Sequence, residues 1–138
     1  MATALLPPHG NTDQKDALPL WQQRIRELAN DVRIWSEAEG WHVGEEAIIL
    51  TEHQVGSYSV PRLKIDLPVY GLYLQPVGRF VMGAQGRVDL YGYPSMDRVM
   101  LLYKGDQWVV VPELGPTWPL PWNAGTFVDL AERLTTGP

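Results

Sequence analysis

The sequence predicts an α+β fold in which a long N-terminal helix packs on a mostly antiparallel sheet of about six strands, with a short helix at the C-terminus. Two features carry this prediction. An apolar stripe with helical spacing covers residues 18–35, and three apolar runs separated by tight turns, a three-stranded meander, cover residues 86–111. The chain has 138 residues and no internal repeat. We therefore expect a single domain, residues 16–138, preceded by a mobile N-terminal tail, residues 1–15.

The N-terminal helix is predicted by apolar side chains that recur at spacings of three and four. The stripe consists of Leu18, Trp21, Ile25, Leu28, Val32 and Trp35. We expect the helix to span residues 17–39, with Asp16 as its N-cap and Gly40, in the left-handed conformation, as the residue that ends it. Pro19 would then lie in the first turn, where its missing N–H is not needed. The stripe also has a heptad rhythm, but its short length and its tryptophans favour packing on a sheet over a coiled coil.

Four short strands are expected between this helix and the meander, at residues 41–43, 47–51, 62–67 and 71–75. Gly44 and the two glutamates after it are expected to join the first two strands. In the third strand three apolar residues alternate with three charged ones, which is typical of a half-buried strand: Leu63, Ile65 and Leu67 against Arg62, Lys64 and Asp66. Pro76 should end the ladder of the fourth strand or lie at an edge.

The meander is predicted to reverse at Pro94–Asp97 and at Lys104–Gln107. A two-residue second turn places Tyr103 opposite Trp108. A four-residue first turn places Tyr93 opposite Arg98 and Tyr91 opposite Met100. One sheet face then carries a core set that the N-terminal helix can cover: Val88, Leu90, Val99, Leu101, Tyr103, Trp108 and Val110.

The opposite face of the meander is too apolar for water and too charged for an ordinary core. It carries Arg87, Asp89, Tyr91, Tyr93, Arg98, Met100, Leu102, Val109 and Val111. One interpretation is that the C-terminal helix and the Pro-rich loop at residues 112–122 cover it, with Asp89 paired to Arg87 or Arg98. The other is a contact surface, because Tyr, Arg and Met are enriched at protein interfaces. The predicted binding residues are Tyr91, Tyr93, Arg98, Met100, Trp118 and Trp122.

The last element is a helix capped by Asn123. Its inner face is expected to carry Phe127, Leu130, Ala131 and Leu134. The loop before it is not expected to form regular structure, because it contains four prolines. Its tryptophans should pack against a surface of the domain and hold the loop there.

Composition excludes several classes of function. The chain has no Cys, which removes thiolate metal sites and cysteine nucleophiles and fits a cytoplasmic location. Its net charge of −5 disfavours nucleic acid and suits a partner protein with a basic surface. No apolar run is long enough to span a membrane. No phosphate-binding loop or nucleophile elbow occurs, so the sequence predicts no cofactor and no catalytic residue.

A metal site is the alternative. His42, Glu46, Asp66 and Asp89 could supply ligands if the fold brought them together. Asp66, followed by a turn and the run at residues 72–77, also resembles the core of the PD-(D/E)XK nucleases, in which an Asp, an acidic residue and a Lys hold Mg²⁺ and activate water. Asp66 matches the first position, whereas Gln75 replaces the acid and Val77 the Lys. The resemblance implies a degenerate, non-cleaving relative.

The sequence therefore favours a non-enzymatic protein-interaction module, of the accessory, immunity-like or self-associating kind, that binds another protein or itself. The alternative is a metal-dependent hydrolase or a degenerate nuclease-like domain. A third hypothesis is a small-ligand pocket between helix and sheet, lined by Trp21, Trp35, Trp41 and Trp108. Against it stands the simpler expectation that the tryptophans fill the core.

Overall fold

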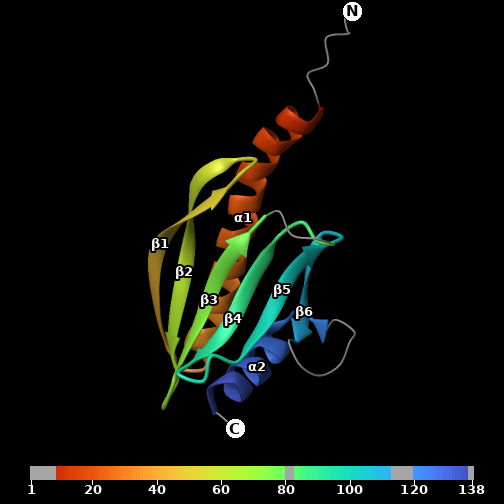
Figure 1. Ribbon diagram of the computed structural model, residues 1–138. Helices are drawn as coiled ribbons and strands as arrows, with labels where there is room; N and C mark the ends of the chain where they lie inside the picture. Colours follow the sequence, from red (N-terminus) through yellow and green to blue (C-terminus); the bar gives the residue numbers. More distant parts are fainter. Residues whose placement is uncertain (1–8, 80–82, 113–119, 137–138) are drawn as a thin grey trace, which may run out of the picture.

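The computed structural model describes residues 9–79, 83–112 and 120–136 and confirms the α+β architecture (Figure 1). Two helices flank a seven-stranded antiparallel sheet whose strands follow one another in chain order. The elements are α1 (His9–Ala38), β1 (His42–Glu52), β2 (Gly56–Asp66), β3 (Gly71–Gly78), β4 (Arg87–Tyr93), β5 (Arg98–Lys104), β6 (Gln107–Pro112), β7 (Leu120–Pro121) and α2 (Ala124–Thr136).

Helix α1 is longer than predicted. It begins at His9, so the expected start at residue 17 and the Asp16 cap are wrong, and Pro19 lies inside the helix. The N-terminal part of α1 extends beyond the sheet (Figure 1). The sequence of this part, residues 9–17, contains no apolar stripe, so periodicity could not reveal it. Residues 9–15 of the predicted tail are thus helical, and residues 1–8 lie outside the described residues.

The two short strands expected at residues 41–43 and 47–51 are one strand, β1. Gly44, Glu45 and Glu46 do not form a turn, because they pair with Lys64, Leu63 and Arg62 of β2. Arginines also hold the two carboxylates, with Arg33 3.1 Å from Glu45 and Arg62 2.7 Å from Glu46. Tertiary partners therefore override the turn signal of a glycine beside two glutamates.

The alternation predicted for β2 is confirmed, since Leu63 and Ile65 are fully buried while Lys64 is exposed. The pairing of β3 with β2 is confirmed as well. This ladder ends at Leu74, so Pro76 follows its end as expected and pairs only with Val88 of β4.

The meander is confirmed, but one of its registers is wrong. Tyr103 lies opposite Trp108 as predicted, whereas Tyr91, not Tyr93, lies opposite Arg98. The β4–β5 reversal is longer than four residues: the Gly92 N–H donates to the Asp97 carbonyl at 2.9 Å. The register differs by two residues, which preserves the alternation, so every side chain stays on its predicted face.

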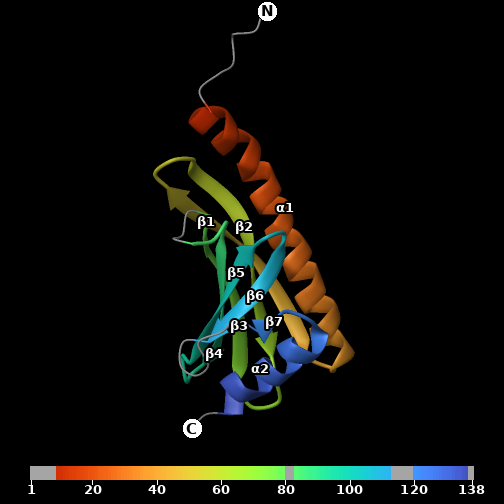
Figure 2. The ribbon, with the colours of Figure 1, turned by 90° about the vertical axis from the view of Figure 1, so that its right-hand side faces the viewer.

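Both helices cover the same face of the sheet (Figure 2). The predicted inner face of α2 is confirmed: Phe127, Leu130, Ala131 and Leu134 are buried in one core with the stripe of α1 and the core face of the meander. The Asn123 cap is confirmed too, since its Oδ1 accepts the Thr126 N–H at 2.9 Å. The interpretation in which α2 covers the opposite face is therefore wrong. Neither described helix is long and apolar enough to cross a membrane.

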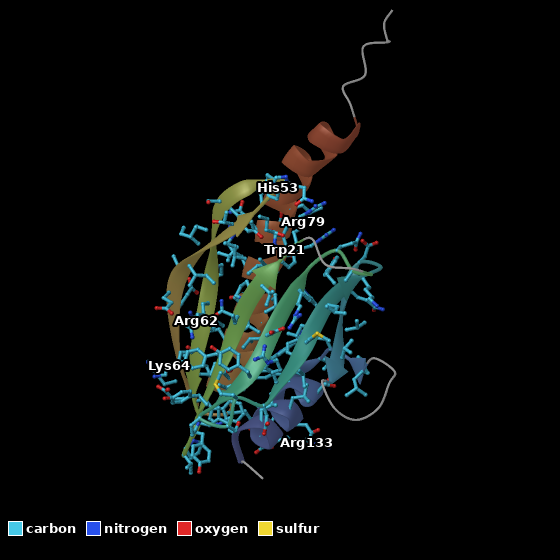
Figure 3. All side chains as sticks on the ribbon, in the orientation of Figure 1. Trp21, His53, Arg62, Lys64, Arg79 and Arg133 are labelled. Atoms are coloured by element: carbon cyan, nitrogen blue, oxygen red, sulfur yellow. The ribbon has the colours of Figure 1, made fainter. Side chains whose placement is uncertain are left out.

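A partly buried chain of polar groups joins α1 to the β1–β2 hairpin. The Trp21 indole N–H donates to the Tyr58 hydroxyl at 3.1 Å, and Tyr58 donates to the Glu52 carboxylate. Glu52 also accepts the Arg79 N–H at 3.0 Å. Trp21, His53 and Arg79 lie at the same end of the sheet (Figure 3). Burial, and then the hydrogen bond to Glu52, raise the pKa of Tyr58 above its ordinary value of 10.0.

This shift makes stability depend on pH at the alkaline end. The folded protein keeps the Tyr58 proton above about pH 10, where the unfolded chain loses it. The stabilisation that Tyr58 contributes to the fold is therefore complete at lower pH and is lost as pH rises. We expect the free energy of unfolding to fall more steeply above about pH 10 in the wild type than in Tyr58→Phe. Urea denaturation at a series of pH values measures the difference, and equal slopes would contradict it.

Candidate functional site

The face of the sheet opposite the helices, here called the open face, is the candidate site. No described helix lies over it, and it is turned to the viewer in Figure 1, with Arg62 and Lys64 labelled on β2 in Figure 3. Strand alternation and register assign to it Arg62, Lys64, Tyr73, Gln75, Arg87, Asp89, Tyr91, Tyr93, Arg98, Met100, Leu102, Val109 and Val111.

Three tyrosines and one arginine form a connected cluster on the open face. The Tyr73 and Tyr91 rings stack with centroids 5.2 Å apart, and the Tyr93 ring meets Tyr73 edge-on at 6.4 Å. The Arg62 guanidinium lies 4.2 Å from the Tyr73 centroid, donates to the Tyr91 hydroxyl at 3.0 Å and pairs with Glu46. Partial burial lowers the pKa of Arg62, but hydrogen bonds to Tyr91 and Glu46 outweigh it and raise that pKa. The cation is therefore fixed in place on the sheet.

A second cluster is built around a buried carboxylate. Asp89 is only 4% exposed, and its oxygens accept two hydrogen bonds from Arg87, at 2.7 and 2.9 Å, and one from Arg98 at 3.3 Å. The sequence predicted one of these two partners, and the structure contains both. Because breaking a buried ion pair is costly, Asp89 holds both guanidinium groups against the sheet.

The predicted binding residues fall into three groups. Tyr91, Arg98 and Met100 are half-buried on the open face, where Tyr93 is 56% exposed. Trp122 is not on this face: its ring lies 5.4 Å from Trp35 and 5.8 Å from that of Phe127, on the helix side. The expectation that Trp122 joins the tyrosines is therefore wrong. Trp118 lies outside the described residues.

Arg62 and Tyr73 were missed by sequence reasoning. Alternation along β2 placed Arg62 on this face, but its meeting with Tyr91 depends on β3 lying between β2 and β4. Tyr73 belongs to the site because it lies directly opposite Tyr91. No signal within either strand could reveal this pairing.

Two of the four residues of the metal hypothesis pair with arginines, and the other two lie at a different place on the sheet. Glu46 pairs with Arg62, Asp89 pairs with two arginines, and Asp66 lies opposite His42 at the far end of the β1–β2 ladder. Within the described ranges, no group of three His, Cys, Asp or Glu side chains could hold a metal ion. Gln75, at the acid position of the nuclease resemblance, lies opposite Asp89.

The tryptophans of the pocket hypothesis pack in the core. Trp21 and Trp41 are 1% and 9% exposed, and Trp35 and Trp108 pack against the same cluster. The Trp21 and Trp108 centroids are 5.9 Å apart. Their rings therefore fill the space between α1 and the sheet, as the simpler expectation stated.

Comparison with known proteins identified no matching family model, no similar curated protein and no similar solved structure. Inference about function therefore rests on the geometry of the chain itself.

Proposed function

We propose that this protein is a non-enzymatic interaction module that binds another protein through the open face of its sheet. The observation that carries the proposal is the Arg62–Tyr73–Tyr91–Tyr93 cluster on a sheet face that no described helix covers. Tyr and Arg are the residue types that dominate the energetics of protein interfaces. The absence of Cys is consistent with the cytoplasmic location that we include in the proposal.

The cluster is organised before any partner binds. Stacked rings and a doubly hydrogen-bonded guanidinium have little rotamer freedom left to lose, which lowers the entropic cost of association. The hollow on this face has a volume of only about 280 Å³, and most of its lining residues are charged, including Glu46, Arg62 and Lys64. Small-molecule sites are usually larger and more apolar. These properties favour a macromolecular partner over a small substrate.

The local charge refines the kind of partner expected. The open face carries more cations than acids: Arg62, Lys64, Arg87, Arg98 and Lys104 against Glu46, Asp66 and Asp89. The net charge of −5 therefore resides on other surfaces, and the basic partner suggested by that net charge does not suit this face. A partner surface bearing carboxylates complements it. Two copies meeting face to face would bring like charges together, which favours a different protein over a homodimer.

Replacement of Tyr93, whose ring is exposed, tests the proposal. We expect Tyr93→Ala to weaken capture of a partner from cell extract by more than about tenfold, the effect of a moderate hot spot. Binding is measured with immobilised wild type and variant at matched concentrations. The control is Ile34→Ala, a similarly exposed residue on α1, at 54% against 56% exposed.

Thermal unfolding of both variants accompanies the binding assay. Both should unfold at nearly the wild-type temperature, because truncation of an exposed side chain removes little core packing. If Ile34→Ala abolishes capture while Tyr93→Ala leaves it unchanged, the partner binds elsewhere. If Tyr93→Ala unfolds the domain, Tyr93 belongs to the core and the proposal fails.

A further inference from the structure

A groove of about 500 Å³ is formed by residues at the end of α1, near the end of α2 and in the turn from β2 to β3. These three segments lie at the same end of the molecule (Figure 2). Its volume is within the range that holds a small organic ligand or a protein side chain. The groove is lined by Glu39, Trp41, Leu67, Pro68, Val69, Tyr70, Glu132 and Thr135. None of these residues belongs to the open-face clusters.

The lining is largely apolar and aromatic, and each of its two walls has a contact that orients it. The Trp41 ring is fixed edge-on against Phe127, with centroids 6.2 Å apart. The turn that forms the opposite wall is closed by the Leu67 N–H, which donates to the Tyr70 carbonyl at 3.0 Å. Val69 and Tyr70 remain 77% and 40% exposed on this wall. A ligand entering here would therefore meet an indole, a phenol and aliphatic groups.

The charge around the groove is negative. Glu39 follows the end of α1 and Glu132 lies near the end of α2, and both are exposed. Among the described residues neither forms an ion pair, whereas the next residue along α2, Arg133, pairs with Asp129 at 3.2 Å. The last turn of α1 contains no basic residue, and its Ser36 and Glu37 carbonyls accept hydrogen bonds from the residues that follow.

Thr135 adds a hydrogen-bond acceptor to the same wall. The residue as a whole is 7% exposed, and its hydroxyl donates to the Ala131 carbonyl at 2.7 Å. Because the single hydroxyl hydrogen is used in this way, the oxygen can only accept a further hydrogen bond. The groove thus offers aromatic rings, two carboxylates and an acceptor to its ligand.

We propose that this groove binds an organic cation, an ammonium or guanidinium group carried on an apolar body. Such a group is attracted to the accessible parts of the Trp41 and Tyr70 rings and to both carboxylates, and its N–H groups can donate to Thr135. An anion is repelled, and a neutral apolar ligand leaves both carboxylates without a partner. The cation can be a free amine or a basic side chain of a bound protein. This inference uses none of the open-face residues, so either proposal can fail alone.

The experiment titrates the ¹⁵N-labelled full chain with three probes. Phenethylamine supplies the cation, phenethyl alcohol is its neutral counterpart, and a blocked leucine–arginine dipeptide represents a protein side chain. Binding is followed at the indole N–H signal of Trp41, assigned with Trp41→Phe. We expect the amine or the dipeptide to bind at least about tenfold more tightly than the alcohol, with affinity falling as salt is added.

Variants that neutralise the two carboxylates test whether the cation binds in this groove. We expect Glu39→Gln and Glu132→Gln each to weaken cation binding by about threefold to fivefold, and the double variant by more than about tenfold. The matched control is Glu37→Gln, an exposed glutamate of α1 that does not line the groove and whose replacement should have no effect. Tighter binding of the dipeptide than of the amine supports a protein source, and the reverse supports a free amine. Equal binding of amine and alcohol, insensitivity to both glutamine variants, or no shift with any probe overturns the proposal.

Discussion

Replacing Gly92 by Ala is expected to destabilise the protein by about 3 kcal/mol, the upper range for overpacking a well-filled site. A Cβ atom at this position would lie 2.1 Å from the Leu134 carbonyl oxygen and 2.8 Å from its carbonyl carbon. Both are backbone atoms of α2 and cannot rotate away. The helix must therefore move off β4, which also disturbs the hydrogen bond that Ser95 donates to the Leu134 carbonyl at 3.1 Å.

The measurement is urea denaturation of wild type and variant, and Gly44→Ala is the matched control. Gly44 is also in a strand, but a Cβ there meets nothing within 4 Å and its backbone has no positive φ. We expect Gly44→Ala to be neutral or slightly stabilising, because Ala restricts the unfolded chain. Equal stabilities of the two variants would show that α2 does not lie against Gly92.

Replacing Trp21 by Ala is expected to cost about 3–5 kcal/mol and to lower the Tm by roughly 10 °C or more. Trp21 is 1% exposed, its ring lies 5.9 Å from that of Trp108, and its indole N–H donates to Tyr58. The variant leaves a large cavity between α1 and the sheet. It also removes the donor to the Tyr58 hydroxyl.

Thermal unfolding followed by circular dichroism measures this effect. Leu20→Ala is the control, since Leu20 is the preceding residue of the same helix and is 44% exposed. Its replacement should change the Tm by only a few degrees. A similar loss of stability in the two variants would mean that α1 is turned differently on the sheet.

A double-mutant cycle tests the position of the Trp21 ring more directly. A Cβ on Gly86 would lie 2.2 Å from Trp21 Cζ3, so Gly86→Ala should be destabilising in the wild type. In the Trp21→Ala background the same change should cost little, because the obstructing ring is gone. A coupling near zero would place the ring elsewhere.

Residues that follow local patterns could be predicted from the sequence. The stripe of α1 was identified because helical periodicity reports the buried face wherever the helix packs on the sheet. The second hairpin of the meander was placed in register because the turn at Gly105–Asp106 leaves one pairing, Tyr103 with Trp108. Alternation assigned Asp89 and Arg98 to the same face, and their ion pair follows from that placement.

Predictions failed where the deciding contact was distant in the sequence or the local signal was ambiguous. The Gly-Glu-Glu segment of β1 looked like a turn, yet Arg33 and Arg62 hold its carboxylates within a continuous strand. The residues Pro94–Asp97 predict a four-residue β4–β5 turn, whereas the Gly92–Asp97 hydrogen bond makes it longer. Trp122 was assigned to the surface, but contacts with Trp35 and Phe127 place it among the helices.

The fold class, the packed part of α1, the three strands of the meander and their two faces follow from the sequence alone, because these depend on periodicity and turn chemistry within short stretches. Strand β7 does not, because Leu120 and Pro121 stand in a segment whose prolines predict irregular structure. Three features depend on the three-dimensional arrangement: both helices cover one face, Arg62 and Tyr73 join Tyr91 on the other, and Glu39 and Glu132 flank one groove. Each of these depends on which strands are neighbours and on how the chain ends converge. Such information resides in pairs of residues far apart along the chain, and no single segment contains it.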